Sequence, residues 1–526
     1  MKSFLCCFSN RISVLFFLIL TSFSFSQQYI KVNGTHFSLN GKPYYFTGTN
    51  FWYGCYIGST GQTGDRERLT RELDRLNEAG IKNLRILGAS ENSASQNAIK
   101  PAIQISPGVY DDSLLTGLDF LLSEMGARNM HAVIFLNNYW DWSGGMGIYN
   151  AWFGGNSWDA SGFYRNINAK EAFKNYIEIL INRINTITGL YYYEDPAIMA
   201  WELANEPRPG FFAAYVDSFY NWIDETAEFI HSLDTNHLVA TGNEGTKGSF
   251  ESENIYLTAH SSEYIDYATI HLCAKNWGWF DANNIEGTYP TALANAESYI
   301  QAHIALARQL NKPLTMEEFG LPRDNEENDP ASPTTARDNY FTALLQLVYD
   351  SAASGSPIAG SNFWGWGGEG RSPNQDHMWR TGDPFVCDPP MEAQGLNSIY
   401  DSDSSTIEII KQYSAMMESL NGNTGVNTRK IISDFQLYQN YPNPFNPITN
   451  FEFRIPALPA GRSDFGLVTL KVFDVLGREV ATLVNEEKPA GTYTVKFDGG
   501  SFASGVYLYR LQAGNYNAAK KLLLLK

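Results

Sequence analysis

The stretch Ile198-Met-Ala-Trp-Glu-Leu-Ala-Asn-Glu-Pro207 decides how the rest of the chain is interpreted. Ile198 to Leu203 is a short apolar run, which is typical of a buried strand. Pro207 disfavours the α conformation at the residue before it, so the strand is expected to end at Asn205-Glu206. A second stretch, Pro313-Leu-Thr-Met-Glu-Glu-Phe-Gly320, likewise predicts a short strand that ends on a carboxylate, Glu318. Each glutamate alone could be a surface turn residue, but the pair indicates glycoside hydrolysis, which uses one acid/base and one nucleophile.

Strand and helix patterns alternate from about residue 43 to residue 418. The expected strands are Tyr44–Asn50, Asn83–Leu87, His131–Leu136, Ile198–Leu203, Leu238–Thr241, Tyr267–His271, Leu314–Glu317 and Ile358–Trp364. Between them, apolar residues recur at helical spacing, as in Leu69, Leu73 and Leu76. Eight such repeats over about 390 residues predict an α/β fold, a (β/α)8 TIM barrel with enlarged loops.

In such a barrel the carboxyl ends of all strands face one rim, where active sites form. Polar or aromatic residues stand at the ends of all but one of the expected strands: Asn50, Trp52, Arg85, Asn137, Asn138, Trp140, Trp142, Asn205, Glu206, His271, Glu318 and Trp364. The long aromatic stretches Asn137–Phe163 and Gly365–Asn397 point to the same rim, because long loops in compact domains are usually functional.

Composition narrows the range of partners. The net charge of −18 argues against nucleic acids and anionic membranes. Aromatic residues make up 14% of the chain, with 12 tryptophans, and flat side chains suit the apolar faces of sugar rings as well as a protein core. No metal-ligand spacing involves the cysteines, and neither a metal nor a cofactor is expected.

Residues 1–26 have the pattern of a signal peptide. Lys2 and Arg11 precede or flank an apolar run, Ile12–Leu20, that is too short to span a bilayer, and Ser24-Phe-Ser26 supplies a cleavage pattern. We therefore expect export and no membrane insertion of the mature protein. Three cysteines remain after cleavage, Cys55, Cys273 and Cys387, so at least one would be a free thiol or have an intermolecular partner.

Several motifs resemble glycoside hydrolase family 5, and within it the endo-β-1,4-mannanases. The residues that carry the likeness are Gly48-Thr-Asn-Phe-Trp-Tyr53, Asn83-Leu-Arg-Ile86, Asn137-Asn-Tyr-Trp-Asp-Trp-Ser-Gly-Gly-Met146, Trp201–Pro207, His271 with Asn276-Trp277, Glu317-Glu-Phe-Gly320 and Asp388–Ser398. The likeness covers roughly residues 30–420. It implies a retaining mechanism on β-mannan, with Glu206 as general acid and then base and Glu318 as nucleophile.

The same resemblance implies roles around the two glutamates. Arg85 would keep Glu318 ionised and oriented, Asn205 would bind the sugar 2-OH, and Trp364 would form the floor of the −1 subsite. His271 would bond the nucleophile or the substrate. Weaker subsite candidates are Trp52, Asn138, Trp140, Trp277 and Trp279. A pKa raised by burial and by the neighbouring carboxylate would suit Glu206 as the acid. Glu317 alternates to the other face of its strand and is left out of the chemistry.

One position departs from the family pattern. The family usually has an aromatic residue, often tyrosine, two residues after the histidine of the sixth strand, and this chain has Cys273. A Cys55–Cys273 disulfide across the rim is one interpretation, which export permits. The alternative is a free Cys273, with Trp277 or Trp279 filling the space. A β-1,4-glucanase, a β-mannosidase and a non-catalytic glycan-binding protein remain open as other functions.

The composition changes after residue 420. A polar linker, residues 422–432, is expected to separate a catalytic domain, residues 27–421, from a tail, residues 433–526. Expected strands Thr469–Val475, Tyr493–Phe497 and Gly505–Gln512 predict a small all-β, immunoglobulin-like sandwich. By composition it could be a carbohydrate-binding module.

The tail also contains Asn440-Tyr-Pro-Asn-Pro-Phe-Asn-Pro447, Val475-Leu-Gly-Arg-Glu-Val480, Ala503-Ser-Gly-Val-Tyr-Leu-Tyr509 and the ending Lys520-Lys-Leu-Leu-Leu-Leu-Lys526. These motifs resemble the C-terminal sorting domain of the type IX secretion system. The resemblance implies the type IX machinery as a partner, export from a Gram-negative cell to the exterior or cell surface, and removal of the tail.

Overall fold

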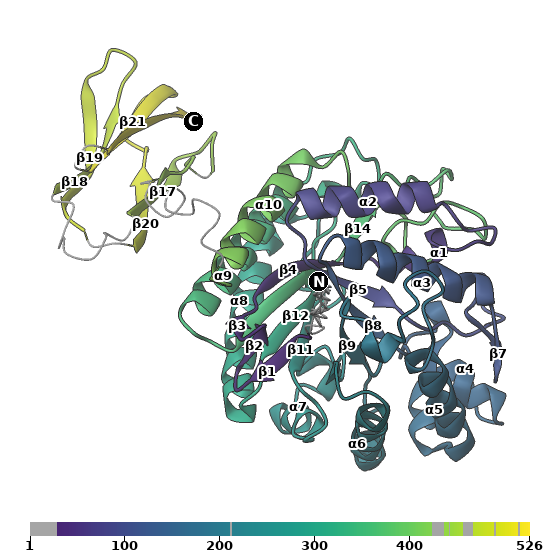
Figure 1. Ribbon diagram of the computed structural model, residues 1–526. Helices are drawn as coiled ribbons and strands as arrows, with labels where there is room; N and C mark the ends of the chain where they lie inside the picture. Colours follow the sequence, from purple (N-terminus) through teal and green to yellow (C-terminus); the bar gives the residue numbers. More distant parts are fainter. Residues whose placement is uncertain are drawn as a thin grey trace, which may run out of the picture. The chain divides into compact units, whose positions relative to one another are not determined.

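The computed structural model describes residues 29–210, 213–422, 436–440, 442–455, 467–488, 491–513 and 516–526. The chain divides into two compact units between Asn421 and Gly422 (Figure 1). The expected signal peptide, residues 1–26, and all but the first residue of the expected linker lie outside the described residues.

The first unit contains an eight-stranded sheet of parallel strands that pair in chain order. These are β4 (Phe46–Asn50), β5 (Asn83–Leu87), β8 (His131–Phe135), β9 (Ile198–Glu202), β10 (Leu238–Ala240), β11 (Ala268–Leu272), β12 (Leu314–Phe319) and β13 (Ile358–Phe363). A parallel bridge between Ala240 and Tyr267 joins the two ends of the order, so the sheet closes on itself. The prediction of a (β/α)8 barrel is confirmed.

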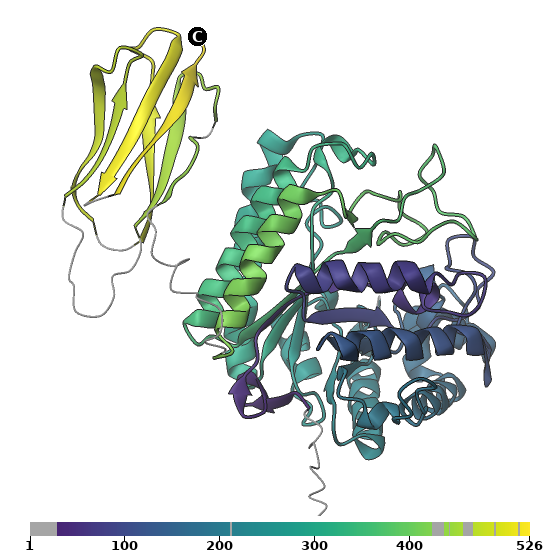
Figure 2. The ribbon, with the colours of Figure 1, turned by 45° about the horizontal axis from the view of Figure 1, so that its top comes forward.

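A covering helix of 8 to 26 residues follows each barrel strand, and Figure 2 shows these helices around the strands. They are α2 (Arg66–Glu78), α3 (Asp112–Ala127), α5 (Ile167–Ile181), α6 (Val216–Leu233), α7 (Glu253–His260), α8 (Ile285–Leu310), α9 (Thr335–Ala353) and α10 (Ser404–Ser419). Several begin where a short polar side chain accepts a backbone N–H, as Asp65, Asp111 and Asn166 do. Two short helices, α1 (Gly54–Ile57) and α4 (Gly145–Trp152), lie in the loops after β4 and β8.

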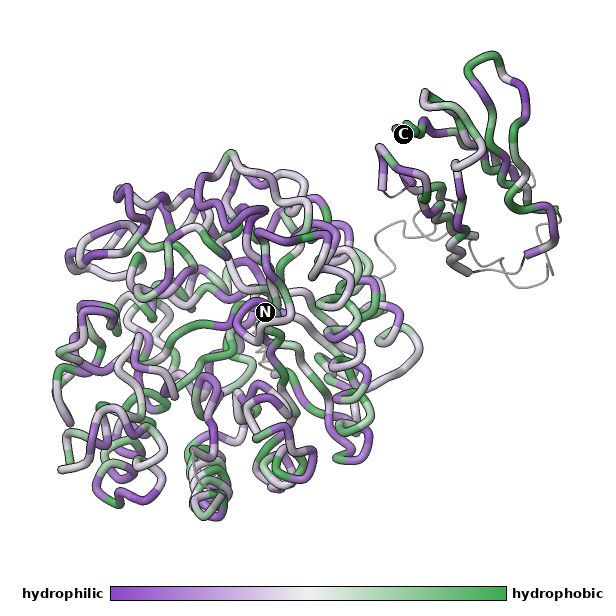
Figure 3. Tube along the Cα trace, turned by 180° about the vertical axis from the view of Figure 1, so that it is seen from behind, coloured by the Kyte–Doolittle hydropathy of each residue, from purple (hydrophilic) through white to green (hydrophobic). Residues whose placement is uncertain are grey.

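The barrel strands are buried on both faces, as parallel strands covered by helices must be. Figure 3 shows the hydrophobic stretches of these strands inside a ring of helices in which hydrophobic and hydrophilic residues alternate. A small antiparallel sheet, β1 (Lys31–Asn33), β2 (His36–Leu39) and β3 (Lys42–Pro43), precedes the barrel. Its Phe37 shares a buried cluster with Phe46, Met199 and Tyr267, so this sheet covers the amino-terminal end of the barrel.

Two further pairs of short strands lie in the loops on the opposite rim. β6 (Gln104–Ser106) pairs with β7 (Val109–Tyr110), and β14 (Trp366–Gly368) pairs with β15 (Ile399–Tyr400). The second pair ties together the two ends of the long loop after β13. That loop is therefore anchored at both ends beside the carboxyl ends of the strands.

The described residues of the second unit form two antiparallel sheets. One contains β16 (Gln436–Leu437), β17 (Ile448–Ile455) and β20 (Gly491–Asp498), and the other contains β19 (Glu479–Glu487), β18 (Leu467–Phe473), β21 (Gly505–Ala513) and β22 (Tyr516–Leu524). Phe451, Leu470, Tyr509 and Leu522 belong to one buried cluster that both sheets share. The all-β prediction is confirmed, and the immunoglobulin-like topology stays a prediction. Among the residues that the structure describes, no helix has the length and apolar character needed to cross a membrane.

Candidate active site

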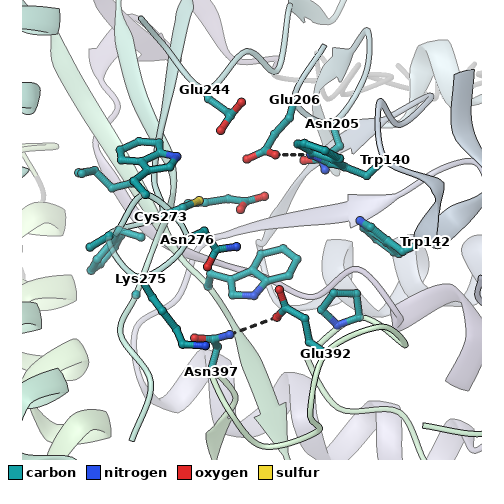
Figure 4. Close-up of a pocket in the computed structure, with 18 of the residues that line it drawn as sticks. Trp140, Trp142, Asn205, Glu206, Glu244, Cys273, Lys275, Asn276, Glu392 and Asn397 are labelled. Carbon is teal, nitrogen blue, oxygen red and sulfur yellow. Dashed lines mark hydrogen bonds between the residues drawn. The ribbon is translucent and has the colours of Figure 1, made fainter. Parts of the chain in front are cut away.

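A cavity of about 400 Å³ opens at the carboxyl ends of the barrel strands (Figure 4). Its lining comes from the loops after β8, β9, β10, β11, β12 and β13, and includes Trp140, Trp142, Asn205, Glu206, Arg208, Glu244, Cys273, Lys275, Asn276, Trp277, Glu318, Trp364, Glu392 and Asn397. Both glutamates singled out in the sequence therefore face the same cavity.

Glu206 lies just beyond the end of β9, with a left-handed backbone φ of 51°. This conformation costs a non-glycine residue roughly 1–2 kcal/mol, and it is held by a hydrogen bond from the Glu206 amide to the Gly242 carbonyl at 2.9 Å. The carboxylate has two partners. Trp140 Nε1 donates to Oε2 at 2.5 Å, and His271 Nδ1 lies 2.8 Å from Oε1. Glu206 as a whole is only 8% exposed, but it lines the cavity, so part of the carboxylate remains open to a ligand.

Glu318 is the penultimate residue of β12 and is 6% exposed. Arg85 Nη1 donates to its Oε1 at 2.5 Å, and His271 Nδ1 lies 3.6 Å from the same oxygen. One carboxylate oxygen of Glu206, one of Glu318 and the Cys273 sulfur all lie within 4.8 Å of one another. The two carboxylates thus approach each other across the cavity.

Arg85, on β5, forms hydrogen bonds with several residues of the site from the interior of the barrel. Its Nε and Nη2 donate to Glu202 at 2.9 and 2.5 Å, and Nη2 also donates to Asn205 Oδ1 at 2.7 Å. Gly242 makes room for this arrangement, because a Cβ there would stand 2.2 Å from Glu202 Oε1. Arg85 thus lies within hydrogen-bonding distance of Glu318, and its role in orienting that carboxylate stays a prediction. Arg85 itself is 1% exposed and does not line the cavity, so it acts through its neighbours and not on substrate.

The charges in the site differ from those expected. Burial alone would raise the pKa of Glu206, but the hydrogen bond and charge of His271, with help from Arg208, leave it below the ordinary value. The pKa of Glu318 is raised by burial and by the charge of Glu206, against the opposing pull of His271 and Arg85. Burial would lower the pKa of His271, yet Glu318, Glu206 and Glu317 raise it to about 10. An imidazolium beside Glu206 is the physical reason for the difference.

Four of the expected substrate-binding residues line the cavity: Asn205, Trp140, Trp277 and Trp364. His271 is fully buried and does not line it, and its closest carboxylate is Glu206 and not the nucleophile candidate Glu318. Two further expectations are wrong, those for Trp52 and Asn138. Trp52 is 1% exposed, and its indole N–H donates to the Cys387 carbonyl at 2.5 Å.

Asn138 is also buried behind the cavity wall, where its Oδ1 accepts from the Trp140 amide at 3.0 Å and from Asn205 Nδ2 at 3.1 Å. The position of Trp52 and Asn138 after strand ends predicts contact with sugar. Instead they support residues that do line the cavity: Trp52 packs on Trp142 with ring centroids 5.2 Å apart.

The suggested Cys55–Cys273 disulfide is wrong, because both cysteines are free. Cys55 is buried in α1, which packs on α3, while Cys273 faces the cavity. Burial and the charges of Glu206 and Glu318 raise the pKa of the Cys273 thiol well above its ordinary value, so the thiol is neutral. Trp277 lines the cavity next to it, and its amide donates to the Cys273 carbonyl at 2.9 Å. The structure thus follows the alternative of a free Cys273.

Sequence reasoning missed four charged residues of the cavity: Arg208, Glu244, Lys275 and Glu392. Arg208 pairs with Glu244 at 2.5 Å and lies over the Trp140 ring, 4.7 Å from its centroid. The strand-end rule that found Glu206 could have found Glu244, but β10 is only three residues long and gives a weak pattern. Glu392 lies in the long loop after β13, inside the stretch Asp388–Ser398 that carries the family likeness, but nothing in that stretch singles out this glutamate as a cavity residue.

The comparisons with known proteins agree with this geometry. Residues 27–422 match the family model described as GH family 5 beta-mannosidase-like, and residues 439–525 match a secretion system C-terminal sorting domain. A putative mannan endo-1,4-beta-mannosidase 4 of Arabidopsis thaliana is 32% identical over 79% of this chain and 99% of its own length.

Two crystal structures from Rhizomucor miehei are also similar. A glycoside hydrolase family 5 mannosidase is 33% identical, with a TM-score of 0.69, over 75% of this chain and 98% of its own. An endo-1,4-beta-mannanase is 25% identical, with a TM-score of 0.57, over 74% of this chain and 99% of its own. Two acidic side chains on a barrel rim, a matching family model over most of the chain and these relatives lead to one conclusion: the chain is a glycoside hydrolase and belongs to the family 5 beta-mannosidase-like group.

Proposed function

We propose that this chain is a secreted, retaining hydrolase of β-1,4-mannosidic bonds that cleaves inside mannan, glucomannan or galactomannan chains. The observation that carries the mechanism is the spacing of Glu206 and Glu318, whose nearest oxygens lie within 4.8 Å. Retaining enzymes hold their carboxyl groups roughly 5–5.5 Å apart, whereas inverting enzymes need roughly 6.5–9.5 Å to admit a water molecule. This close approach of the two carboxylates supports a retaining reaction.

Each residue then has a step. Glu318 attacks the anomeric carbon, and Arg85 fixes the orientation of its carboxylate through the 2.5 Å hydrogen bond. Glu206 gives a proton to the departing oxygen and later removes one from the attacking water. Asn205, held by Arg85, offers its free amide hydrogen to the sugar 2-OH, and Trp364 lies under the sugar ring.

The substrate class rests on the relatives, which are named mannan endo-1,4-beta-mannosidases in Arabidopsis thaliana and Solanum lycopersicum. The cavity suits a neutral sugar polymer, since tryptophans at positions 140, 142, 277 and 364 line it from three loops. An enzyme that cleaves inside the polymer does not need to bind a chain end.

One observation favours a second candidate, a β-mannosidase that removes single sugars from a chain end. Figure 4 shows Glu392 and Asn397 on the side of the cavity away from Glu206. The leaving group lies on the side of the acid, so the sugars that stay attached to Glu318 extend toward Glu392. Glu392 is held by Asn397 Nδ2 at 3.2 Å, and burial and the charge of Asp388 raise its pKa to about 7. A side chain fixed there leaves little room beyond one sugar.

Product analysis separates the two candidates. Internal cleavage of galactomannan lowers its viscosity while few reducing ends form, and mannohexaose yields a mixture of shorter oligosaccharides. Removal of end sugars yields mannose alone, and Glu392→Ala would then release longer products. Carboxymethylcellulose tests for a glucanase. Proton NMR of the first product reports the β anomer for a retaining enzyme, and the α anomer would contradict the proposal.

We also propose that residues 433–526 direct export by the type IX machinery and are dispensable for hydrolysis, with residues 27–421 as the catalytic domain and 422–432 as the linker. The sorting-domain match over residues 439–525 supports this. Residues 27–421 expressed alone should unfold cooperatively and hydrolyse mannan at the full-length rate. In a host with the secretion system, the same truncation should leave the enzyme inside the cell.

A further inference from the structure

His271 lies in β11, and its fully buried imidazole stands between two carboxylates. Nδ1 is 2.8 Å from Glu206 Oε1, and Nε2 faces Glu317 Oε2 at 3.8 Å. One ring therefore connects the acid/base candidate of the cavity to a carboxylate that does not line the cavity.

Glu317 precedes Glu318 in β12, so its side chain points to the opposite face of the strand. It is 1% exposed, and its Oε1 accepts from the Tyr267 hydroxyl at 3.3 Å. Among the described residues, neither Glu317 Oε2 nor His271 Nε2 has a hydrogen-bond partner. A ring nitrogen that can donate and a carboxylate oxygen that can accept thus face each other in the interior without a partner in the described part of the chain. A small movement of either side chain would shorten the 3.8 Å distance to that of a hydrogen bond.

The proton that Glu206 delivers needs a source. In the free site His271 and Arg208 hold the pKa of Glu206 below its ordinary value against the effect of burial, so this carboxyl is ionised near neutral pH. Its two hydrogen-bond donors are the Trp140 indole, which does not release a proton at this pH, and His271 Nδ1. Of these two donors, only the imidazolium can supply an acid proton.

We propose that His271 stores the proton that Glu206 delivers to the leaving group, and that Glu317 is the positioning residue that keeps the second ring hydrogen on Nε2. The proposal rests on the proposed function, in which Glu206 is the general acid. Holding Nε2–H toward Glu317 ensures that the proton released by the ring comes from Nδ1, which faces Glu206.

The proton balance closes over one turnover. The Nδ1–H bond of the His271 imidazolium breaks as an O–H bond forms on Glu206 Oε1, leaving a neutral imidazole with its hydrogen on Nε2. Glu206 then protonates the glycosidic oxygen as its bond to the anomeric carbon breaks and the bond to Glu318 forms. In the second half, water attacks as the bond to Glu318 breaks, and the water proton passes to Glu206 and back to His271 Nδ1.

Charged groups from every neighbouring strand face this ring. They are Arg85 on β5, Glu202 and Glu206 from β9, Glu244 after β10, and Glu317 and Glu318 on β12; the Cys273 thiol lies on the ring's own loop. Carboxylates outnumber Arg85, so the cationic form of the ring is favoured, and its pKa is raised to about 10 although burial alone would lower it. Glu317 is the one that meets Nε2.

Glu317→Gln tests this role, because it removes the charge at nearly constant shape. The measurement is the pH dependence of kcat/KM on a mannooligosaccharide and on 2,4-dinitrophenyl β-mannoside, whose leaving group needs no acid. For the oligosaccharide, the basic limb should move to lower pH by about one unit, a tenfold loss at alkaline pH. The dinitrophenyl substrate should keep its wild-type basic limb, which a merely structural defect would not allow.

Asp234→Asn is the matched control. It removes a buried carboxylate that also bonds a histidine, His237, at 2.7 Å but at the other end of the barrel, and it should leave the pH profile unchanged. His271→Asn is the second variant: it stores no proton, so it should lose about 10²-fold on the oligosaccharide and little on the activated substrate.

An unchanged basic limb in folded Glu317→Gln, or equal losses on both substrates in His271→Asn, overturns the proposal. If the proposed function itself were wrong, a different result would be seen. In that case Glu206→Gln would hydrolyse the oligosaccharide at the wild-type rate.

Discussion

The two ends of the barrel each contain a buried carboxylate–histidine pair, and the pairs differ in what surrounds them. At the amino-terminal end, Asp234 and His237 are 2.7 Å apart, with both side chains fully buried. Asp234 also accepts from Trp201 Nε1 at 2.7 Å, and His237 Nε2 lies 2.9 Å from the Asp195 carbonyl. Every polar atom of this pair has a partner, which is what a structural role requires.

At the carboxyl end, Glu206 and His271 are 2.8 Å apart, but the pair is open on both sides. Glu206 keeps a face toward the cavity, and His271 Nε2 has no hydrogen-bond partner among the described residues. The distance within a carboxylate–histidine pair therefore does not tell whether the pair has a structural or a catalytic role. Unmet hydrogen-bonding capacity and crowded like charges do, and such features mark functional sites.

The largest effect should come from the carboxylates of the open end. Glu318→Gln removes the nucleophile, and we expect hydrolysis to fall by at least about 10⁴-fold while the fold is kept. Glu206→Gln should cost roughly 10²–10⁴-fold on mannan and far less on 2,4-dinitrophenyl β-mannoside. Initial rates on both substrates, with thermal unfolding as a check of the fold, measure this. Wild-type turnover by either variant would remove that residue from its role.

Arg85 connects the active-site end of the barrel to its interior. Its loss should therefore lower both the activity and the stability. Arg85→Met leaves Glu202 and Glu318 buried without their cation, and breaking a buried ion pair costs roughly 3–5 kcal/mol. We expect a lower free energy of unfolding in urea and loss of activity. Arg85→Lys keeps the charge but loses the bidentate contact with Glu202. Its stability and activity should therefore lie between those of the wild-type protein and those of Arg85→Met. Unfolding of Arg85→Met at the wild-type midpoint would contradict this account.

The two ends should also respond differently to pH. Burial raises the pKa of Glu202 to about 7 and of Glu244 to about 8, despite their arginine partners. Since these folded pKa values exceed the unfolded ones, the folded state binds more protons, and stability falls as pH rises from about 4.5 to 8. The total is at most on the order of several kcal/mol. Burial would raise the pKa of Asp234, but the hydrogen bond and charge of His237 lower it. Asp234 therefore stays ionised throughout this pH range, and the pair keeps its contribution to stability.

Thermal unfolding between pH 5 and pH 8 measures this difference. Glu202→Gln and Glu244→Gln should flatten the decline in melting temperature, and Asp234→Asn should not. A melting temperature that rises over this range in the wild-type protein would show that the buried carboxyls of the open end do not control it.

The smallest effect on catalysis should come from the closed pair. Asp234→Asn weakens the bonds to Trp201 and His237, which should cost about 1–3 kcal/mol of stability. The kcat per folded molecule should not change, because the pair lies at the opposite end of the barrel from the cavity. Urea unfolding and rates below the unfolding temperature measure the two quantities separately. A fall in kcat without unfolding would show that the two ends are coupled.

The sequence by itself determined the barrel and the two glutamates. Short apolar runs, Pro207 after Glu206, and Phe319-Gly320 after Glu318 are local signals. One general rule, that parallel strands end on the same rim, brings such residues together without any knowledge of pairing. Strand-end position alone was not enough for Trp52 and Asn138, because each could point into the cavity or behind its wall, and packing of the loops placed both behind it.

Only the tertiary structure decided which charges meet. That His271 bonds Glu206, that Glu317 faces the other side of its ring, and that Glu392 reaches the cavity from a long loop depend on contacts between distant segments. The register of β11 against β12 pairs His271 with Glu318, with a shift between Ile270 and His271, and no local pattern encodes that shift. Electrostatic effects follow from distance and burial, so the ionisation of the site could be known only after the strands were placed.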